Sequence, residues 1–528
     1  MCGNAVSTKM ADTEPEPRLS RETDDQTEVL AFLAAPQTHG GASVRRIDTH
    51  AASVFLAGDR ALKIKRAVRF PFLDYATLAK RKQACAAELA VNAPYAPEIY
   101  RRVVPITREA GGALALDGKG TPVEWAVEMR RFDETRTLDH LAREIDEALA
   151  DALGRAVAAA HARAQAIDGA AWIGAVGSYI DEHTEAFAAH REIFAGTEIE
   201  ALGRASRAAY RRIVPLLEAR GRRGLIRRIH GDLHLGNIAL IDGRPVLFDA
   251  IEFSDIIASG DVLYDLAFLL MDLLERGLTQ PANVVLNRYL AETHNAEDLD
   301  GLAALPFFLS MRAAIRAKVT LARMERTDAR ERDAAAESAR AYFAFAARAI
   351  APPKPTFIAV GGLSGAGKTR LARALAPHVG PMPGAVIVRS DIERKALFGA
   401  GETEKLPEQA YAPAASDRVY AVLLDKASRI LRAGHAAILD AVFARPRERD
   451  ALAGVAESAG AALRGLFLTT RLATRLERVE ARSGDASDAD RQVARDQENY
   501  DLGRLDWTQI DASGSVEETV ARARAALD

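Results

Sequence analysis

Residues 357–375 (FIAVGGLSGAGKTRLARAL) limit the fold of this chain more than any other segment. An apolar run of strand length leads into a glycine-rich loop that fits the pattern G-x-x-x-x-G-K-[ST], and a helical pattern starts directly after it. Glycine allows several backbone N–H groups to converge on one anion, and the N-terminus of the following helix adds a favourable dipole. The segment therefore predicts a phosphate-binding loop between a strand and a helix, with an ordinary glycine-rich turn as the alternative.

The residues around this loop predict an α/β domain. Four apolar runs of strand length (TFIAV, AVIVRSD, AAILDAVF and LRGLFLTT) alternate with helical stretches such as RVYAVLLDKASRILRAG. Alternating strands and helices are typical of a doubly wound parallel sheet with right-handed crossovers. Just before them, residues 350–355 (IAPPKP) contain three prolines, through which a helix cannot continue. We therefore expect a linker at 350–355 that separates two cores, and a separate domain at 356–528.

Several polar side chains of this domain stand where phosphoryl transfer would use them. Lys368 is expected to reach the β- and γ-phosphates of a nucleotide, and Thr369 is expected to bind Mg²⁺. Asp440 ends the strand AAILD and suits direct or water-mediated contact with the metal. The other loop residues expected at the phosphates are Gly362, Ser364, Gly365, Ala366 and Gly367.

Two further groups are candidates for the chemistry itself. Asp391 ends the strand AVIVRSD and is expected to accept the proton of an acceptor hydroxyl, while Arg394, one helical turn later, holds an anion or the acceptor. A helix N-cap and a surface arginine are the alternative interpretations. Arg475, Arg478 and Arg482 follow one another along a helix that leads into a polar loop. Arginines on a closing lid would neutralise transition-state charge, whereas a solvated helix face is the alternative.

Together these segments resemble the P-loop small-substrate kinase family, which includes zeta-toxin-like and polynucleotide-kinase-like members. The pieces that carry the resemblance are SDIER and the arginine-bearing helix followed by RSGDASDA. The resemblance implies a P-loop NTPase fold for residues 356–528 and transfer of the ATP γ-phosphoryl group to a hydroxyl, with Asp391 as the base. It leaves open whether the acceptor is a sugar, a nucleotide or a sugar nucleotide.

A second segment, residues 227–253 (RRIHGDLHLGNIALIDGRPVLFDAIEF), carries another set of polar groups. His230, Asp232 and Asn237 form an H-x-D-x-x-x-x-N pattern, and Asp249 follows twelve residues after Asn237. Phosphoryl transfer needs a carboxylate at the acceptor hydroxyl and oxygen ligands for Mg²⁺. Asp232 fits the first role, and Asn237 with Asp249 fits the second if a hairpin with DGRP at its tip returns the chain. His230 either stabilises the loop by hydrogen bonding or takes part in the chemistry.

This pattern resembles the aminoglycoside phosphotransferase-like branch of the protein-kinase-like fold, which includes choline, fructosamine, homoserine and methylthioribose kinases. The resemblance covers residues 26–349 and implies a small strand-rich lobe followed by a large helical lobe. In RALKIKRAV it implies a lysine that pairs with the α- and β-phosphates of ATP; Lys63 matches best, and Lys65 on the same strand face is the alternative. Glu88 is then the helix glutamate that pairs with the lysine. The backbone near Glu128 and Met129 is implied to meet adenine.

One departure from that family concerns the metal-binding aspartate. It stands in FDAIEF, where the family and its protein-kinase relatives have DW or DFG. Glu252 in this segment either helps to bind metal or acceptor, or faces solvent. Asp265, in YDLAFLL, is expected to be a buried structural acceptor of hydrogen bonds rather than a catalyst.

Composition argues against several other classes of protein. A net charge of −3 gives no general basic surface for nucleic acid. The most apolar stretch, DLAFLLMDLL, is short and interrupted by Asp272, so we expect no membrane span. Cys2 and Cys85 are the two cysteines, too few for a disulfide framework. Residues 1–25 are polar and acidic, which predicts a disordered tail and no signal peptide, and hence a cytoplasmic protein.

The sequence thus predicts a chain with two domains of mixed α/β and α+β content and two sites for ATP and Mg²⁺. We interpret it as a tandem kinase whose domains each phosphorylate a hydroxyl of a small-molecule substrate. The domain order resembles bacterial proteins described as bifunctional aminoglycoside phosphotransferase/ATP-binding proteins. The alternatives are a nucleotide-sensing regulatory role for one domain, and a nucleic-acid end kinase, which the charge balance disfavours. The oligomeric state is left open.

Overall fold

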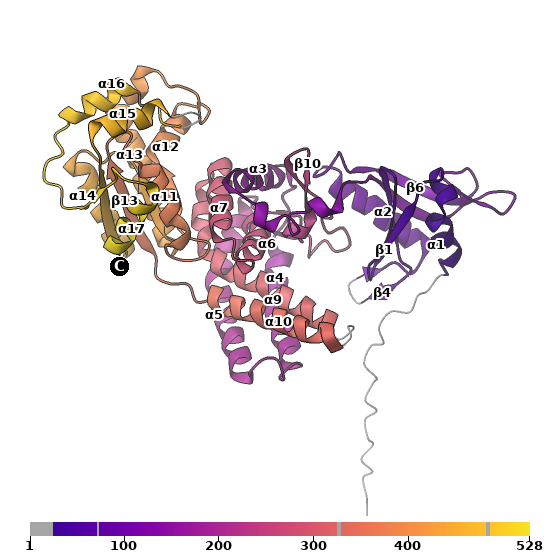
Figure 1. Ribbon diagram of the computed structural model, residues 1–528. Coiled ribbons are helices and arrows are strands. Elements are labelled where there is room, and N and C mark those ends of the chain that lie inside the picture. The colour runs from indigo at the N-terminus through magenta and orange to yellow at the C-terminus, as the bar shows by residue number, and fades with distance from the viewer. Residues whose placement is uncertain (1–24, 71–72, 325–328, 482–485, 528) are drawn as a thin grey trace, which may run out of the picture. The chain divides into compact units, whose positions relative to one another are not determined.

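A computed structural model describes residues 25–70, 73–324, 329–481 and 486–527 (Figure 1). The tail predicted to be disordered, residues 1–25, lies outside the described residues except for its last position. The chain divides into two compact units, Met1–Asp133 with Phe248–Asp255, and Glu134–Leu247 with Ile256–Asp528. None of the helices in the described ranges has the length and apolar character that crossing a membrane requires.

The first unit is built around a six-stranded antiparallel sheet in the order β1-β2-β3-β8-β6-β7. Ala57 pairs with Arg60, so β2 and β3 form a hairpin whose turn is AGDR. Side chains alternate along β3, so that Leu62 and Ile64 enter an apolar core shared with α1. The elements are α1 (Thr27–Ala34), β1 (Val44–Asp48), β2 (Ala52–Ala57), β3 (Arg60–Lys65), β4 (Arg69–Phe70), β5 (Leu73–Asp74), α2 (Leu78–Asn92), β6 (Tyr100–Arg108), β7 (Leu114–Leu116) and β8 (Thr121–Arg130).

The second unit opens with a helical part. Long helices fill most of residues 147–222, in agreement with the implied helical lobe. Helix α6 is buried along nearly its whole length, which makes it the central helix. The elements of this part are α3 (Glu147–Arg163), α4 (Ala170–Ala188), α5 (Gly196–Arg222), β9 (Ile226–Arg228), β10 (Ile238–Ile241), β11 (Arg244–Leu247), β12 (Ser259–Asp261), α6 (Val262–Glu275), α7 (Thr279–Thr293), α8 (Ala296–Gly301), α9 (Leu305–Met324) and α10 (Ala329–Ala349).

The same unit continues into a five-stranded sheet in the order β14-β15-β13-β16-β17, and every pairing is parallel. This confirms the predicted doubly wound parallel sheet. Strand β13 is central, so the glycine-rich loop after it emerges between the carboxyl ends of β15 and β16. The elements are β13 (Thr356–Gly362), α11 (Lys368–Leu375), β14 (Val386–Arg389), α12 (Ser390–Leu397), α13 (Pro413–Arg432), β15 (Ala437–Asp440), α14 (Pro446–Ala459), β16 (Ala462–Thr469), α15 (Leu472–Glu480), α16 (Arg491–Asp496), β17 (Thr508–Asp511) and α17 (Val516–Leu527).

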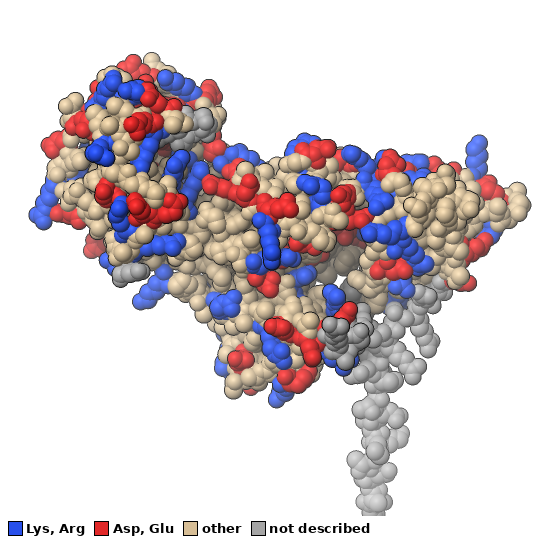
Figure 2. All heavy atoms as spheres, in the orientation of Figure 1, with Lys and Arg blue, Asp and Glu red and all other residues tan. Residues whose placement is uncertain are grey.

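The apolar core of the parallel sheet, which includes Ile358, Leu371 and Ile510, is formed by residues that follow the proline-rich segment. The helical part and the parallel sheet belong to one compact unit, although residues 350–355 lie between α10 and β13 and belong to neither. Side chains of α7 bond to the main chain beside β14, the edge strand of the parallel sheet. The polar groups of that edge are thereby partly satisfied by the helical part. On the face shown in Figure 2, cationic and anionic side chains are interspersed.

Candidate active sites

The glycine-rich loop has a backbone that other residues rarely adopt. Gly362, Gly365 and Gly367 have φ angles of 138°, 83° and 99°, all in the region that favours glycine. A Cβ atom added to Gly365 would lie 2.6 Å from the carbonyl oxygen of Arg475. Helix α11 starts at Lys368, directly after the loop. The sequence pattern therefore corresponds to a tight turn whose shape depends on glycine, followed by a helix N-terminus suited to an anion.

Thr369 and Asp440 meet at the carboxyl ends of the central strands. The Thr369 hydroxyl donates a hydrogen bond of 2.6 Å to Oδ2 of Asp440, and Nε of Arg389 lies 3.5 Å from the same oxygen. Strand register explains this meeting, because Val360 of β13 and Arg389 of β14 both pair with Asp440. A hydroxyl beside a carboxylate at a helix N-terminus is a donor set that suits Mg²⁺ bound with phosphates and water.

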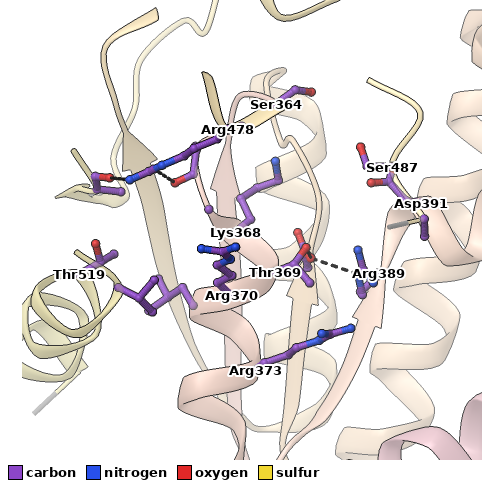
Figure 3. Close-up of a pocket in the computed structure, with 18 of the residues that line it drawn as sticks. Ser364, Lys368, Thr369, Arg370, Arg373, Arg389, Asp391, Arg478, Ser487 and Thr519 are labelled. Atoms are coloured by element: carbon purple, nitrogen blue, oxygen red, sulfur yellow. Dashed lines mark hydrogen bonds and ion pairs between the residues drawn. The ribbon is translucent and has the colours of Figure 1, made fainter. Parts of the chain in front are cut away.

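A cavity of about 620 Å³ surrounds these groups. Figure 3 shows Arg389 and Asp391 on one side of it and Arg478 and Thr519 on the opposite side, with Lys368 between them. Of the residues predicted for this site, the lining includes Ser364, Gly365, Ala366, Gly367, Lys368, Thr369, Asp391, Asp440 and Arg478. Residues from distant parts of the chain therefore converge on one space that is large enough for a nucleotide and a small acceptor.

Asp391 lies in the first turn of α12, because β14 ends at Arg389, two residues earlier than the strand run suggested. Burial and the neighbouring carboxylate of Asp440 raise the pKa of Asp391 above its ordinary value, against the opposing charges of Lys368 and Arg389. The side chain of Ser487 donates a hydrogen bond to the Asp391 carboxylate. A carboxyl group with a raised pKa beside a phosphate-binding loop is a candidate general base.

Arg394 does not take the place expected for it. Its guanidinium is buried, donates a hydrogen bond of 2.5 Å to the carbonyl of Ala410 and lies over the ring of Tyr411. The described residues that line the cavity do not include Arg394. A surface arginine, the alternative interpretation, is wrong as well. Arg389, five residues earlier, does line the cavity, and the sequence marks it only by its position at the end of a strand run.

The arginines of α15 have structural partners. Arg478 donates hydrogen bonds to the carbonyls of Ala512 and Gly514 at 2.9 and 3.2 Å, and it also lines the cavity. Arg475 is buried, bonds to the carbonyl of Ser364 at 3.2 Å and forms an ion pair with Glu498. Arg475 therefore stabilises the glycine-rich loop by bonding to its main chain, and it does not act as a lid residue. Arg482 lies outside the described residues, and its role stays a prediction.

In the first unit, Glu88 of α2 pairs with both candidate lysines. Lys63 Nζ lies 2.8 Å from Glu88 Oε1 and 2.8 Å from Asp249 Oδ1, whereas Lys65 Nζ lies 2.6 Å from Glu88 Oε2 and 2.5 Å from Glu252. Burial alone would raise the pKa of Glu88, but the two lysines lower it to about 2. Lys63 is the lysine that reaches Asp249, and its side chain is 15% exposed, against 3% for Lys65.

Glu252 has buried partners instead of facing solvent. Besides Lys65, it accepts a hydrogen bond of 2.9 Å from the hydroxyl of Tyr75. Two side chains hold the segment that carries Asp249. Asn92 bonds to both main-chain groups of Ala250, at 2.7 and 3.2 Å, and the Tyr100 hydroxyl accepts from the Asp249 N–H at 3.2 Å. The segment Phe248–Asp255 is therefore part of the first unit, with Asp249 in an unusual conformation of φ 62° and its carboxylate 46% exposed.

Glu128 and Met129 lie inside β8, which runs on to Arg130. Glu128 pairs with Leu62 of β3 and Arg102 of β6, so it stands between two neighbouring strands. The side chain of Glu128 forms an ion pair of 3.0 Å with Arg102. The contact of these two backbone positions with adenine stays a prediction.

In the second unit, the amide of Asn237 donates hydrogen bonds of 3.0 Å to both the main-chain oxygen and the carboxylate of Asp232. Although burial raises the pKa of Asp232, a hydrogen bond from His234 and the charges of His230 and Arg316 lower it to about 2. The Asp232 side chain is 40% exposed. The hairpin that follows has the predicted tip, with positive φ at Asp242 and Gly243. Asp232 is therefore an ionised, accessible carboxylate that the amide N–H groups of Asn237 hold in place.

Buried groups hold this loop in place. Asp265 accepts the N–H groups of His230 and Gly231 at 2.9 and 3.0 Å, as the sequence predicted for a structural acceptor. Asp272 accepts the N–H of Leu235 at 2.9 Å. Both aspartates lie on α6, so the central helix of the unit positions the loop. The described residues hold no cluster of three or more His, Cys, Asp or Glu for a metal, and a Mg²⁺ ion completed by phosphates and water needs fewer.

In a comparison with known proteins, two family models match separate parts of the chain. Residues 43–305 match the model of a phosphotransferase enzyme family, and residues 357–500 match that of an AAA domain. Uncharacterized proteins of Mycobacterium bovis and Mycobacterium tuberculosis are 29% identical over 491 residues, 90% of this chain and 94% of each relative. The two family matches do not overlap, and residues 350–355 lie between them.

Among solved structures, the chain is similar to a sugar kinase from Janibacter sp. at 21% sequence identity and a TM-score of 0.25. The similarity covers 33% of this chain and 95% of that kinase. It is also similar to a choline/ethanolamine kinase family protein from Mesorhizobium loti at 18% sequence identity and a TM-score of 0.35. That similarity covers 61% of this chain and 98% of the other protein.

Proposed function

We propose that this chain, which joins a domain of the phosphotransferase enzyme family to a P-loop kinase-like domain, is a tandem kinase with two sites for ATP, Mg²⁺ and a small-molecule acceptor. The first domain is proposed to span residues 26–349 and the second 356–528. The observation that carries the proposal is the cavity in which Thr369, Asp440, Lys368 and Asp391 converge. When bound, ATP would supply the γ-phosphoryl group and Mg²⁺ would neutralise charge on its phosphates.

In the P-loop site, the glycine-rich backbone and Lys368 bind the phosphates, and Thr369 with Asp440 holds the metal. Asp391 accepts the proton of the acceptor hydroxyl at a carboxylate oxygen. Its raised pKa makes it a stronger base than an exposed aspartate, while Lys368 and Arg389 favour the ionised form. Arg478 lines the cavity and offers positive charge near the phosphates.

In the phosphotransferase site, Glu88 fixes Lys63 so that its ammonium group orients the α- and β-phosphates. Asp232 accepts the proton of the acceptor hydroxyl, and its low pKa keeps it ionised at neutral pH. Asn237 and Asp249 are the proposed oxygen ligands of the metal. The loop around Asp232 keeps its shape because α6 accepts its main-chain N–H groups.

The test incubates full-length wild type, Asp232→Asn and Lys368→Ala protein with Mg·ATP and a bacterial small-metabolite extract. Mass spectrometry then records which metabolites gain a phosphoryl group. We expect Asp232→Asn to lower the yield of one product by roughly 10²–10⁴-fold, the usual scale for removing a general base, and Lys368→Ala to abolish a different product. If only one variant loses a product, the other domain is regulatory, and if neither does, the kinase assignment of both sites fails. Glu28→Gln, a change in an exposed ion pair of the first unit, is the control.

A further inference from the structure

Helix α7 of the phosphotransferase part is fixed to the strand that leads to Asp391. The N–H of Ile387 donates a hydrogen bond of 2.7 Å to Oδ1 of Asn287, whose amide donates to the carbonyl of Ala385 at 3.2 Å. Asn283, one turn earlier, donates to the same carbonyl at 3.1 Å. Because Ile387 lies two residues before Arg389, these bonds to the main chain set the position of α7 relative to the acceptor side of the P-loop cavity.

Arg288 follows Asn287 on α7, and it lines that cavity. Its Nε lies 2.5 Å from Oδ1 of Asp151, and its Nη1 lies 2.9 Å from Oε1 of Glu402 and 3.4 Å from Glu292. Among the described residues, none accepts a hydrogen bond from its Nη2, which keeps two N–H donors. Carboxylates therefore hold the guanidinium in place, and 14% of the side chain stays exposed.

Glu402 belongs to the segment between α12 and α13, and it lines the cavity together with Arg288. The ion pair between Arg288 and Glu402 therefore connects the segment between α12 and α13, which lines the acceptor side of the cavity, to α7. Arg155 of α3 also bonds to Glu402, at 3.1 Å, and contacts Asp151 and Glu292 as Arg288 does. However, the described residues that line the cavity do not include Arg155, so only one of the two arginines borders the site.

The cavity carries more positive than negative charge. Among the described residues, its lining contains six cationic side chains, namely Arg288, Lys368, Arg370, Arg373, Arg389 and Arg478, and three carboxylates, namely Asp391, Glu402 and Asp440. A Mg²⁺–nucleoside triphosphate complex is itself anionic and offsets part of this excess. An acceptor with an acid group would offset more of it, and a fixed guanidinium is well suited to bidentate binding of an oxyanion.

We propose that Arg288 is a specificity-determining residue of the P-loop site, which binds an acid group of the acceptor through its remaining N–H donors. The phosphotransferase part then supplies one wall of the other domain's acceptor pocket. The acceptor is a small hydroxyl compound that carries a carboxylate, sulfate or phosphate group. This inference rests on the kinase function proposed for the P-loop site and adds the class of its substrate.

The test compares Arg288→Ala, Arg288→Lys and Arg155→Ala, each in full-length protein that also carries Asp232→Asn to silence the first site. The probe is a bacterial small-metabolite extract, applied as a dilution series with saturating Mg·ATP, and the readout is the product that Lys368→Ala abolishes. The dilution that gives half the maximal rate reports the relative KM, and the plateau reports kcat. Passing the extract over an anion exchanger first shows whether the acceptor is retained.

We expect an acceptor that the exchanger retains, and Arg288→Ala should raise its KM about 10- to 100-fold, the scale of a lost charge-assisted hydrogen bond. The plateau and the KM for ATP should change less than about threefold, and Arg288→Lys should recover part of the loss. Arg155→Ala should leave the KM within about twofold. An acceptor in the flow-through, or equal effects of Arg155→Ala and Arg288→Ala, would overturn the inference while the kinase function stands. Absence of any product that depends on Lys368 would overturn the kinase function itself, and the inference with it.

Discussion

Replacing Glu88 by Gln removes the central charge of the ionic network in the first unit. Glu88 is buried and pairs with Lys63 and Lys65, which also contact Asp249 and Glu252. The change leaves the two buried ammonium groups with fewer opposite charges. Lowering the pKa of Glu88 from 4.5 to about 2 corresponds to about 3 kcal/mol of stability. Breaking a buried pair by removing one partner costs about 3–5 kcal/mol, so the two approaches agree.

Hydrogen exchange measured by mass spectrometry reports this loss locally, which suits a chain with two compact units. At pH 7 we expect peptides from β3 and α2 to exchange on the order of 10²-fold faster in Glu88→Gln than in wild type, the equivalent of about 3 kcal/mol. Peptides from the parallel sheet of the second unit should exchange unchanged. Because the pKa of Glu88 is lowered in the folded state, its stabilisation is present above pH 4.5 and is lost as the pH falls toward 2.

The matched control is Glu28→Gln, which removes a carboxylate paired with Arg108 on the surface of the same unit. This pair is exposed and screened by solvent, so we expect exchange in β3 and α2 to change much less than in Glu88→Gln. Equal acceleration of exchange in the two variants, or a loss below about 1 kcal/mol in Glu88→Gln, would refute the buried ionic network as a source of stability. If Glu88→Gln lost only phosphorylation at the first site, without faster exchange, the network would still be refuted as a source of stability.

Two further predictions concern the second unit. Asp440→Asn should raise the Mg²⁺ concentration for half-maximal activity of the P-loop site about 10- to 100-fold, because the carboxylate beside Thr369 is lost. Glu402→Gln changes another carboxylate of the same cavity and should leave this Mg²⁺ concentration unchanged. Equal shifts in the two variants would contradict the assignment of Asp440 to the metal. Burial lowers the pKa of His435 to about 4, against a hydrogen bond to the carbonyl of Gly384, so its contribution to stability is lost as the pH falls from 6.5 toward 4. Denaturant titrations measure the free energy of unfolding at pH 7 and at pH 5. The decrease of this free energy between pH 7 and pH 5 should be about 2 kcal/mol larger in wild type than in His435→Gln. An identical pH dependence of the two proteins would show that this histidine does not titrate as argued.

Much of the local structure could be predicted from short patterns. The spacing of Gly362, Gly367, Lys368 and Thr369 predicts both the turn and the helix that follows it, because glycine conformations and helix starts depend on neighbouring residues. The period-two alternation in RALKIKRAV likewise predicts a strand with its lysines on one face. The turn, the helix start and the strand each depend on a few adjacent positions, and the structure contains each of them at the predicted residues.

The sequence by itself determined the two phosphate-handling segments, the α/β class of the last part and the helical character of the middle. Only the tertiary structure decided that Arg394 is buried against Tyr411, that Arg389 enters the cavity and that Glu252 pairs with Lys65. It also decided that Arg288 borders a cavity whose loop lies about 80 residues later. The reason is physical, since backbone conformation follows local chemistry, whereas the partner of a charged side chain depends on how distant elements pack around it.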